Sequence, residues 1–163
     1  MDENEFWSMI ERSRAEDPDA QEEALERLLT GRSREELEAF DRIYREQLVR
    51  AYRWDLWGAG YVIAGGMGDD SFDYFCDWLI GQGREVFEQA LADPDSLADV
   101  PDVEEDEIEA EELRYAVQKA YESTHGEELP IAGQSQPADP AGEEWDEDDV
   151  DSLYPRLAAR FGG

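Results

Sequence analysis

The stretch from Ala51 to Gly83 constrains the fold more than any other part of the chain. It holds three of the five tryptophans and the only cysteine. Within it, residues 54–64 carry apolar or small side chains on every side of a helical axis, with Asp55 as the only charge. A helix that is apolar all round is buried, and a carboxylate inside it needs a partner, water or a shifted pKa. We therefore expect this stretch to form the centre of the fold and to be the first place to search for a site.

Helical periodicity dominates the chain, and no stretch alternates as a strand would. Ser33 and Glu36 form a capping box at the start of a long apolar pattern. The glycines at 65, 66 and 68 end that pattern. We predict a single compact all-α domain of about six helices, in which a central buried helix covers 34–64 and a helix over 71–81 packs beside it.

Composition divides the chain into three parts. Residues 1–126 are expected to form the helical core domain. Residues 127–145 are rich in Pro, Gly, Ser and Gln, which is typical of a flexible linker or a surface loop. Residues 146–163 are expected to form a C-terminal helix that docks on the core, with a break at Tyr154 because Pro155 follows it. The residues that recur with helical spacing and are predicted to dock on the core are Val150, Leu153, Tyr154, Leu157, Ala158 and Phe161.

The chain is strongly acidic, and its charge is unevenly spread. It has 44 acidic and 14 basic residues, a net charge of −30, and residues 85–163 hold 24 of the acids against four bases. Such a chain repels phosphate backbones and anionic lipids, so we expect no direct nucleic-acid binding and no membrane binding. A basic protein partner, or mimicry of nucleic acid, would suit this charge, as would metal or salt adaptation, although solubility alone is the simpler explanation. Of the two runs of seven acids, 104–112 and 143–151, the second contains Trp145 as an anchor against the core or a partner.

A single cysteine, Cys76, excludes an internal disulfide, and no apolar segment approaches the roughly 20 residues that span a bilayer. The N-terminus shows no secretory leader, so we expect a cytoplasmic protein. Cys76 falls on the apolar face of its helix, where it acts as a small hydrophobe and not as the nucleophile of a pair with His125. We therefore predict no catalytic residue.

Aromatic and acidic residues gather around the glycine-rich turn at 65–68. Together they would line a small-ligand pocket, in which rings supply apolar area and carboxylates supply polar contacts. Aromatic residues at helical spacing are also what an ordinary core requires, so both interpretations stay open. The candidate ligand-binding residues are Trp54, Asp55, Trp57, Asp69, Asp70 and Trp78.

The aspartates admit two interpretations of their own. Oxygen ligands at Asp69, Asp70 and Asp73 would suit Mg²⁺ or Ca²⁺, and Mg²⁺ is the cofactor that the sequence leaves open. The simpler interpretation is structural. Asp69 and Asp70 then begin a helix, while Asp55 pairs with an arginine such as Arg84 or accepts a tryptophan N–H.

Four motifs carry a resemblance to a known family: AYRWDLWGAGYVIAGG, GDDSF, FCDWLIGQGREVF and ALADPDSLA. They resemble the bacterial family known as domain of unknown function 4240. Shorter likenesses lie at Phe6-Trp7, at Ala120-Tyr121-Glu122 and in WDEDDVDSLYPRL near the end. The resemblance implies a small bacterial cytoplasmic protein and no particular activity. It also implies one spatial cluster of Trp54, Asp55, Trp57, Asp69, Asp70, Phe72, Trp78 and Gly83.

Two classes of function follow. The first is a non-catalytic interaction or regulatory module whose acidic surface meets a basic protein partner, which the charge of residues 85–163 favours. The second is an enzyme or small-ligand binder that uses the Asp/Trp cluster, with or without Mg²⁺, which the lone Asp55 favours. The sequence favours the first class and does not decide whether the protein is an enzyme.

Overall fold

The computed structural model describes residues 1–101, 103, 108, 113–130 and 137–162. In these ranges the chain is helical and forms no β-strand, which confirms the all-α class. The helices outnumber the six expected because two predicted helices are each divided and short 3-10 helices follow α6 and precede α7. The elements are α1 (Glu3–Glu16), α2 (Gln21–Leu29), α3 (Arg34–Ala51), α4 (Trp54–Ala64), α5 (Asp69–Gly81), α6 (Arg84–Ala92), η1 (Pro94–Asp99), η2 (Leu113–Tyr115), α7 (Ala116–His125), α8 (Val150–Leu153) and α9 (Pro155–Phe161).

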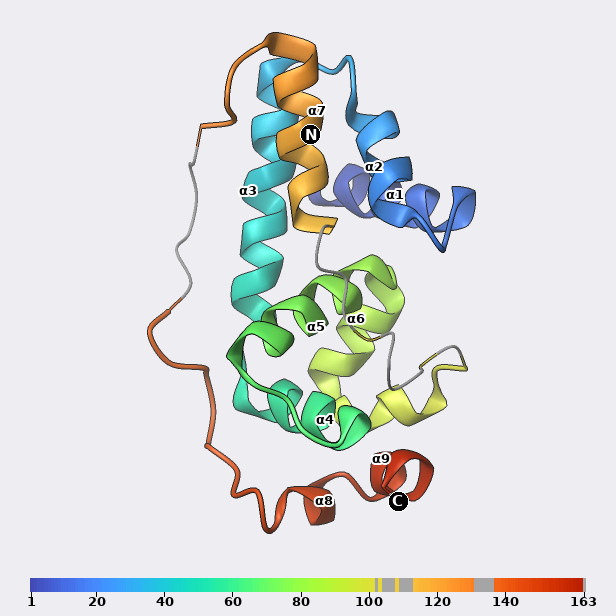
Figure 1. Ribbon diagram of the computed structural model, residues 1–163, viewed down its shortest axis with the longest axis vertical. Coiled ribbons are helices and arrows are strands. Elements are labelled where there is room, and N and C mark those ends of the chain that lie inside the picture. The colour runs from blue at the N-terminus through green and yellow to red at the C-terminus, as the bar shows by residue number, and fades with distance from the viewer. Residues whose placement is uncertain (102, 104–107, 109–112, 131–136, 163) are drawn as a thin grey trace.

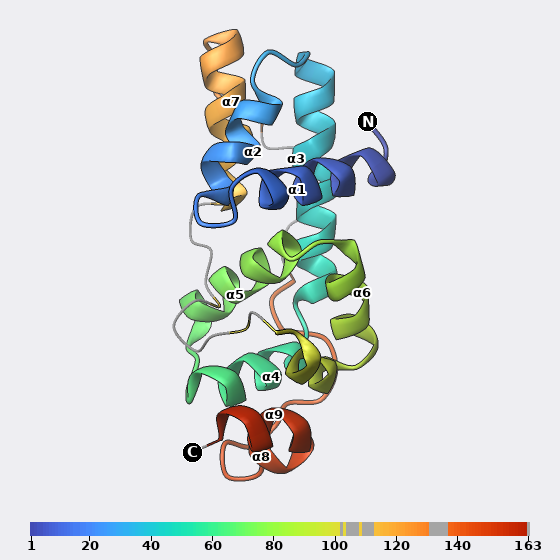
Figure 2. The same ribbon diagram turned by 90° about the vertical axis from the view of Figure 1, so that its right-hand side faces the viewer.

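The helices form two tiers around α3, the longest of them (Figure 1). In this view α1, α2 and α7 surround the upper half of α3, while α4, α5 and α6 gather at its lower end. Figure 2 shows the same division from the side. Buried side chains of both tiers belong to one continuous cluster, from Phe6 and Leu25 above to Leu56 and Phe75 below. The two tiers therefore share one hydrophobic core.

The central helix predicted over 34–64 is divided into two, which corrects that prediction. α3 ends at Ala51 and α4 begins at Trp54, so that α4 crosses the end of α3 (Figure 1). The main-chain groups at the break find a partner far away in the sequence. The N–H of Trp54 donates to the carbonyl of Ala141 (2.9 Å), and the N–H of Ala141 donates to the carbonyl of Tyr52 (3.0 Å). Neither glycine nor proline marks the break, so no local signal predicts it.

α4 is largely buried, as predicted, but its acid is not. Leu56, Ala59 and Ile63 are fully buried, whereas Asp55 lies in the first turn with 42% of its side chain exposed and pairs with Arg53. The carboxylate therefore meets both water and an arginine partner, two of the three outcomes expected for it, although its Oδ1 is buried without a hydrogen-bond partner among the described residues. In the ranges that the structure covers, no helix is long and apolar enough to cross a membrane.

A glycine-rich turn joins α4 to α5 and fixes the position of Trp57. Gly65 is left-handed (φ 71°), a conformation that glycine adopts without steric cost, and its N–H closes α4 on the carbonyl of Tyr61. The indole N–H of Trp57 donates a 2.9 Å hydrogen bond to the carbonyl of Met67. α5 begins at Asp69, two residues before its predicted start, and its first-turn acids suit the helix dipole.

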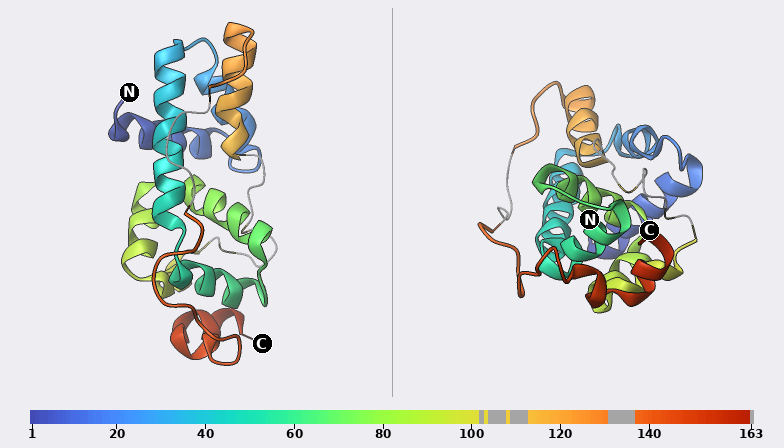
Figure 3. Two further views of the ribbon diagram at one scale, coloured as in Figure 1. Left: turned by 90° about the vertical axis from the view of Figure 1, so that its left-hand side faces the viewer. Right: turned by 60° about the horizontal axis from the view of Figure 1, so that its bottom comes forward.

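The C-terminal segment packs against α4 and η1 (Figure 3). It forms two short helices that meet at Tyr154, the break that Pro155 predicts. Tyr154 and Leu157 are buried, whereas Leu153, which was expected on the same face, is 56% exposed. The interruption at Tyr154 breaks the helical repeat, so residues on its two sides no longer share one face.

Candidate functional site

An open pocket lies where α3, α4 and α5 meet the returning C-terminal chain. Its volume is about 360 Å³, within the range of roughly 300–1,000 Å³ for small-ligand sites. Aromatic rings form its inner surface and carboxylates lie at its edges. A short C-terminal segment forms one side. We name it the aromatic pocket, and its lining residues are Tyr52, Trp54, Trp57, Asp69, Phe72, Asp73, Ala138, Asp139 and Pro140.

The aromatic surface is a stack of four rings. The ring centroids of Trp54 and Trp57 are 5.1 Å apart with their planes at 5°. Those of Trp57 and Phe72 are 4.9 Å apart with their planes at 8°. Tyr52 continues the stack beyond Phe72 at 6.0 Å. Phe72 is buried and the other three rings are half-buried, so the stack is held by the core and still reaches the pocket.

Three acidic side chains face this aromatic surface from two segments. Asp69 and Asp73 lie about one turn apart on α5, and Asp139 approaches from the C-terminal chain. Burial raises the pKa of the Tyr52 phenol, and the charges of Asp73, Asp69 and Asp139 raise it further. The pocket therefore has a negative potential. Among the residues that the structure describes, no basic side chain lines it.

Residues 137–149 form an extended strap that leads from the pocket to α8 (Figures 1 and 3). The strap pairs with the α3–α4 break through Ala141, and Trp145 packs edge-on against Trp54 (6.1 Å, 88°). The indole N–H of Trp145 also donates to the carbonyl of Trp54 at 2.7 Å. Trp145 thus anchors the acidic run 143–151 on the core, one of the two roles that the sequence left open.

The predicted linker 127–145 is only partly covered by the structure, because residues 131–136 lie outside the described ranges. Its described C-terminal part is hydrogen-bonded to the core as the strap. The domain boundaries 1–126, 127–145 and 146–163 stay predictions. The acidic run 104–112 also lies largely outside the described residues, whereas 143–151 is exposed except at Trp145 and Val150.

The structure brings some of the candidate residues together and separates others. Trp54, Trp57 and Asp69 all line the aromatic pocket. Asp70 is exposed outside it, on the first turn of α5. Trp78 is buried in the core, 8% exposed and stacked on a neighbouring phenylalanine. The ligand-binding role of all these residues stays a prediction.

The cluster that the family resemblance implies is likewise formed in part. Phe72 joins the pocket, but Asp55 pairs with Arg53 and not with Arg84. Gly83 precedes α6, where its neighbour is Glu11 of α1. The pocket instead contains Tyr52 and Asp139, which sequence reasoning missed.

The proposed metal ligands do not gather into a coordination site. In the described part of the chain, no three His, Cys, Asp or Glu side chains are arranged to hold a metal ion. Asp69 and Asp70 lie in the first turn of α5 and Asp73 in the next, and of the three only Asp69 and Asp73 line the aromatic pocket. The Mg²⁺ site at these residues therefore stays a prediction without geometric support.

Sequence reasoning also missed a fully buried carboxylate, Asp77 of α5. It is fully buried and accepts hydrogen bonds from the Tyr44 hydroxyl (2.5 Å) and from Nε of Arg114 (2.7 Å). Burial raises the pKa of Asp77 to about 6, although Arg114 and Tyr44 act to lower it. The group does not line the aromatic pocket. It ties α3, α5 and η2 together, so we assign it a structural role.

Comparison with known proteins places the chain in a family. No curated protein and no solved structure matches it. The family model described as "Protein of unknown function (DUF4240)" matches residues 1–123. That span includes the aromatic stack and the two α5 carboxylates that line the pocket, but not the strap. It ends before the likeness near residues 145–157. The chain therefore belongs to the DUF4240 family of proteins of unknown function.

Proposed function

We propose that this protein is a non-catalytic interaction module that binds a basic protein partner through its acidic surface. The aromatic pocket is the anchor, and it receives one arginine side chain of the partner. The observation that carries the proposal is the placement of Asp69, Asp73 and Asp139 around a stack of aromatic rings, with no base among the lining residues described.

The chemistry of the pocket favours a cation. The faces of tryptophan and tyrosine rings attract a cation placed over them, with energies of about 0.5–2 kcal/mol. Carboxylates beside the rings add Coulombic attraction and accept hydrogen bonds. Arginine suits both features, because its planar guanidinium stacks on rings and donates to carboxylates in a forked geometry.

The charge of the surrounding surface favours a basic protein over an isolated cation as the binding partner. The strap leaves the pocket as a run of exposed acids, among them Glu143, Glu144 and Asp146. A net charge of −30 would speed the encounter with a positively charged partner and make binding weaken with salt. A bacterial, cytoplasmic setting belongs to this proposal as well.

Two neighbouring aspartates allow a matched test. Asp69 lines the pocket, whereas Asp70 is exposed next to it and does not. The probe is a basic decapeptide with one arginine among lysines, titrated calorimetrically. We expect Asp69→Asn to weaken binding about fivefold, or ~1 kcal/mol, and Asp70→Asn to have little effect. Equal losses in the two variants would exclude the pocket as anchor.

The peptide supplies a second control. Citrulline in place of the arginine removes the guanidinium charge, and citrulline in place of one lysine gives the same net charge. We expect the first replacement to weaken binding more than the second. Binding that does not weaken between low and high salt would contradict the interaction module itself.

The volume of the aromatic pocket also supports a second candidate function, in which the protein binds a small ligand through the same lining residues. Free arginine amide would then bind as tightly as the decapeptide. Under the interaction module it binds much more weakly, because it makes no contact with the exposed acids of the strap.

A further inference from the structure

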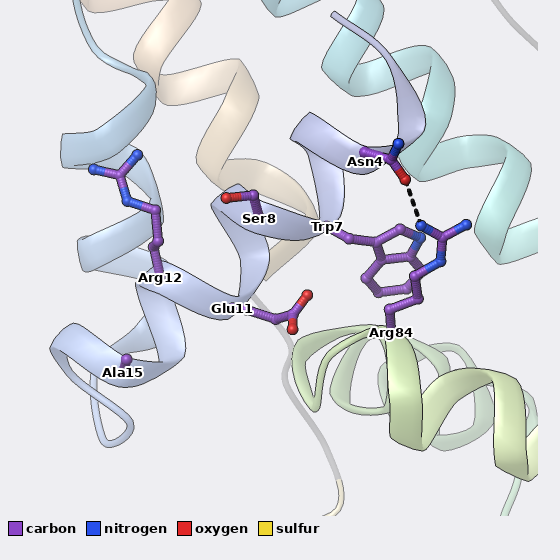
Figure 4. A pocket seen from close by; sticks show the side chains of 7 residues that line it. All are labelled: Asn4, Trp7, Ser8, Glu11, Arg12, Ala15 and Arg84. Carbon is purple, nitrogen blue, oxygen red and sulfur yellow. Dashed lines mark hydrogen bonds between the residues drawn. The ribbon is translucent and has the colours of Figure 1, made fainter.

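A second hollow, of about 430 Å³, lies between α1 and the start of α6 (Figure 4). It shares no lining residue with the aromatic pocket. In Figure 4 the side chain of Arg84 extends from the first residue of α6 toward Asn4 and the indole of Trp7. The remaining lining residues are Ser8, Glu11, Arg12 and Ala15 of α1.

The hollow gathers hydrogen-bond donors that form no hydrogen bond or ion pair with a carboxylate among the described residues. The charge of Arg84 does act, after that of Arg50, to lower the pKa of Glu88 on the same helix. At least nine of the 14 basic side chains form ion pairs with carboxylates. Arg12 and Arg84 form none among the described residues. The polar contact of Arg84 is a 2.7 Å hydrogen bond to the neutral Oδ1 of Asn4, and that of Arg12 is a 4.0 Å contact with the sulfur of Met9. Arg42 also forms no ion pair among the described residues, so the distinguishing feature of this hollow is that two such arginines line it together.

Trp7 supplies an independent observation. Its side chain is 1% exposed, and its Nε1 is buried without a hydrogen-bond acceptor in the part of the chain that the structure covers. An indole N–H can only donate, and a buried donor without an acceptor is unfavourable. An oxygen atom bound beside Arg84 would supply the missing acceptor.

We propose that this hollow binds a carboxylate group of a small organic acid. Its oxygens accept hydrogen bonds from Arg84 and from the Trp7 indole, and Arg84 shifts from Asn4 to admit them. A guanidinium matches the two oxygens of a carboxylate, and Arg12 adds positive charge at the rim. Glu11 lies in the same hollow and repels anions, which disfavours a phosphate dianion more than a carboxylate monoanion.

The indole N–H of Trp7 gives a direct readout. The full-length protein is labelled with ¹⁵N, and its indole signals are recorded at pH 7 while sodium acetate replaces sodium chloride at constant ionic strength. The signal that Trp7→Phe removes identifies Trp7. We expect this signal to shift saturably with acetate and much less with phosphate. A shift that does not saturate, or equal or tighter binding of phosphate, would overturn the carboxylate assignment.

Three variants test the named contacts. Arg84→Gln should weaken acetate binding at least tenfold, which corresponds to about 1.4 kcal/mol, and Glu11→Gln should strengthen it. Arg42→Gln is the matched control, because Arg42 is exposed, forms no ion pair among the described residues and lies outside the hollow. Unchanged signals from the other indoles show that each variant is folded. Equal affinity in Arg84→Gln and wild type would refute the proposal.

Discussion

The indole N–H of Trp145 donates a 2.7 Å hydrogen bond to the main-chain carbonyl of Trp54. A residue beyond the span of the family match thereby holds the strap on the main chain of Trp54, whose ring lines the aromatic pocket. Trp145→Phe keeps an aromatic ring but removes the donor. Because a net hydrogen bond contributes about 0.5–1.5 kcal/mol, we expect the Ala141 amide hydrogen to exchange with solvent about two- to twelvefold faster. The measurement is hydrogen exchange by NMR, and unchanged exchange at Ala141 would contradict this role.

Gly58 permits the close approach of the C-terminal segment to α4. A Cβ at this position would lie 2.6 Å from the Tyr154 hydroxyl oxygen and 3.0 Å from Cδ1 of Trp145. Alanine gains up to about 1 kcal/mol of helix propensity over glycine, but the overlap with two held rings costs about 1–3 kcal/mol. We therefore expect Gly58→Ala to lower the free energy of unfolding and to speed proteolysis of the strap. Gly68→Ala is the control, because a Cβ there meets open space, and it should leave strap proteolysis unchanged.

The sequence predicts those features that depend on neighbouring residues. Glycine at 65 ends α4 as expected. The proximity of Trp54, Trp57 and Asp69 follows from a helix, a short turn and a second helix, all within one stretch of chain. Burial of Cys76 follows from helical periodicity in the same way.

The remaining features depend on residues distant in sequence. The main-chain groups at the α3–α4 break are hydrogen-bonded to Ala141, which lies about ninety residues away in the sequence. The local pattern through Tyr52 therefore predicts one continuous helix. Asp139 enters the pocket from a stretch whose composition indicates only a loop. The burial of Asp77 could not be predicted for a similar reason, because its hydrogen-bond partners Tyr44 and Arg114 lie on other helices.

Asp95 of η1 acts as a cap for α9. Its two carboxylate oxygens accept the main-chain N–H groups of Arg156 (3.2 Å) and Leu157 (2.9 Å), and its side chain is nearly buried. Loss of a side-chain cap costs about 0.5–2 kcal/mol. We expect Asp95→Ala to lower the free energy of unfolding by that amount and to speed tryptic cleavage after Arg160. Asp99→Ala, which removes only an exposed ion pair with Arg156, should have a much smaller effect.

Asp77 makes the stability of the fold depend on pH in a direction opposite to that of most aspartates. Burial raises its folded-state pKa to about 6, from 3.8 for an exposed aspartate. Between these values the native state binds the proton more readily than the unfolded state, so this group adds stability as pH falls from about 7 to 4. A shift of about two units corresponds to about 3 kcal/mol. We expect the melting temperature to rise on mild acidification, measured by circular dichroism across this pH range.

Asp77→Asn separates this contribution from the general relief of negative charge on acidification. Asparagine keeps the shape and an acceptor for Tyr44 or Arg114, but it loses the ion pair with Arg114, so the variant should be less stable than wild type. Because asparagine cannot titrate, the variant should also show a flatter stability profile between pH 4 and 7. Asp41 is also buried, and burial raises its pKa, so Asp41→Asn should flatten the profile as well. A profile in Asp77→Asn as steep as that of wild type would show that Asp77 keeps its charge throughout, held by Arg114.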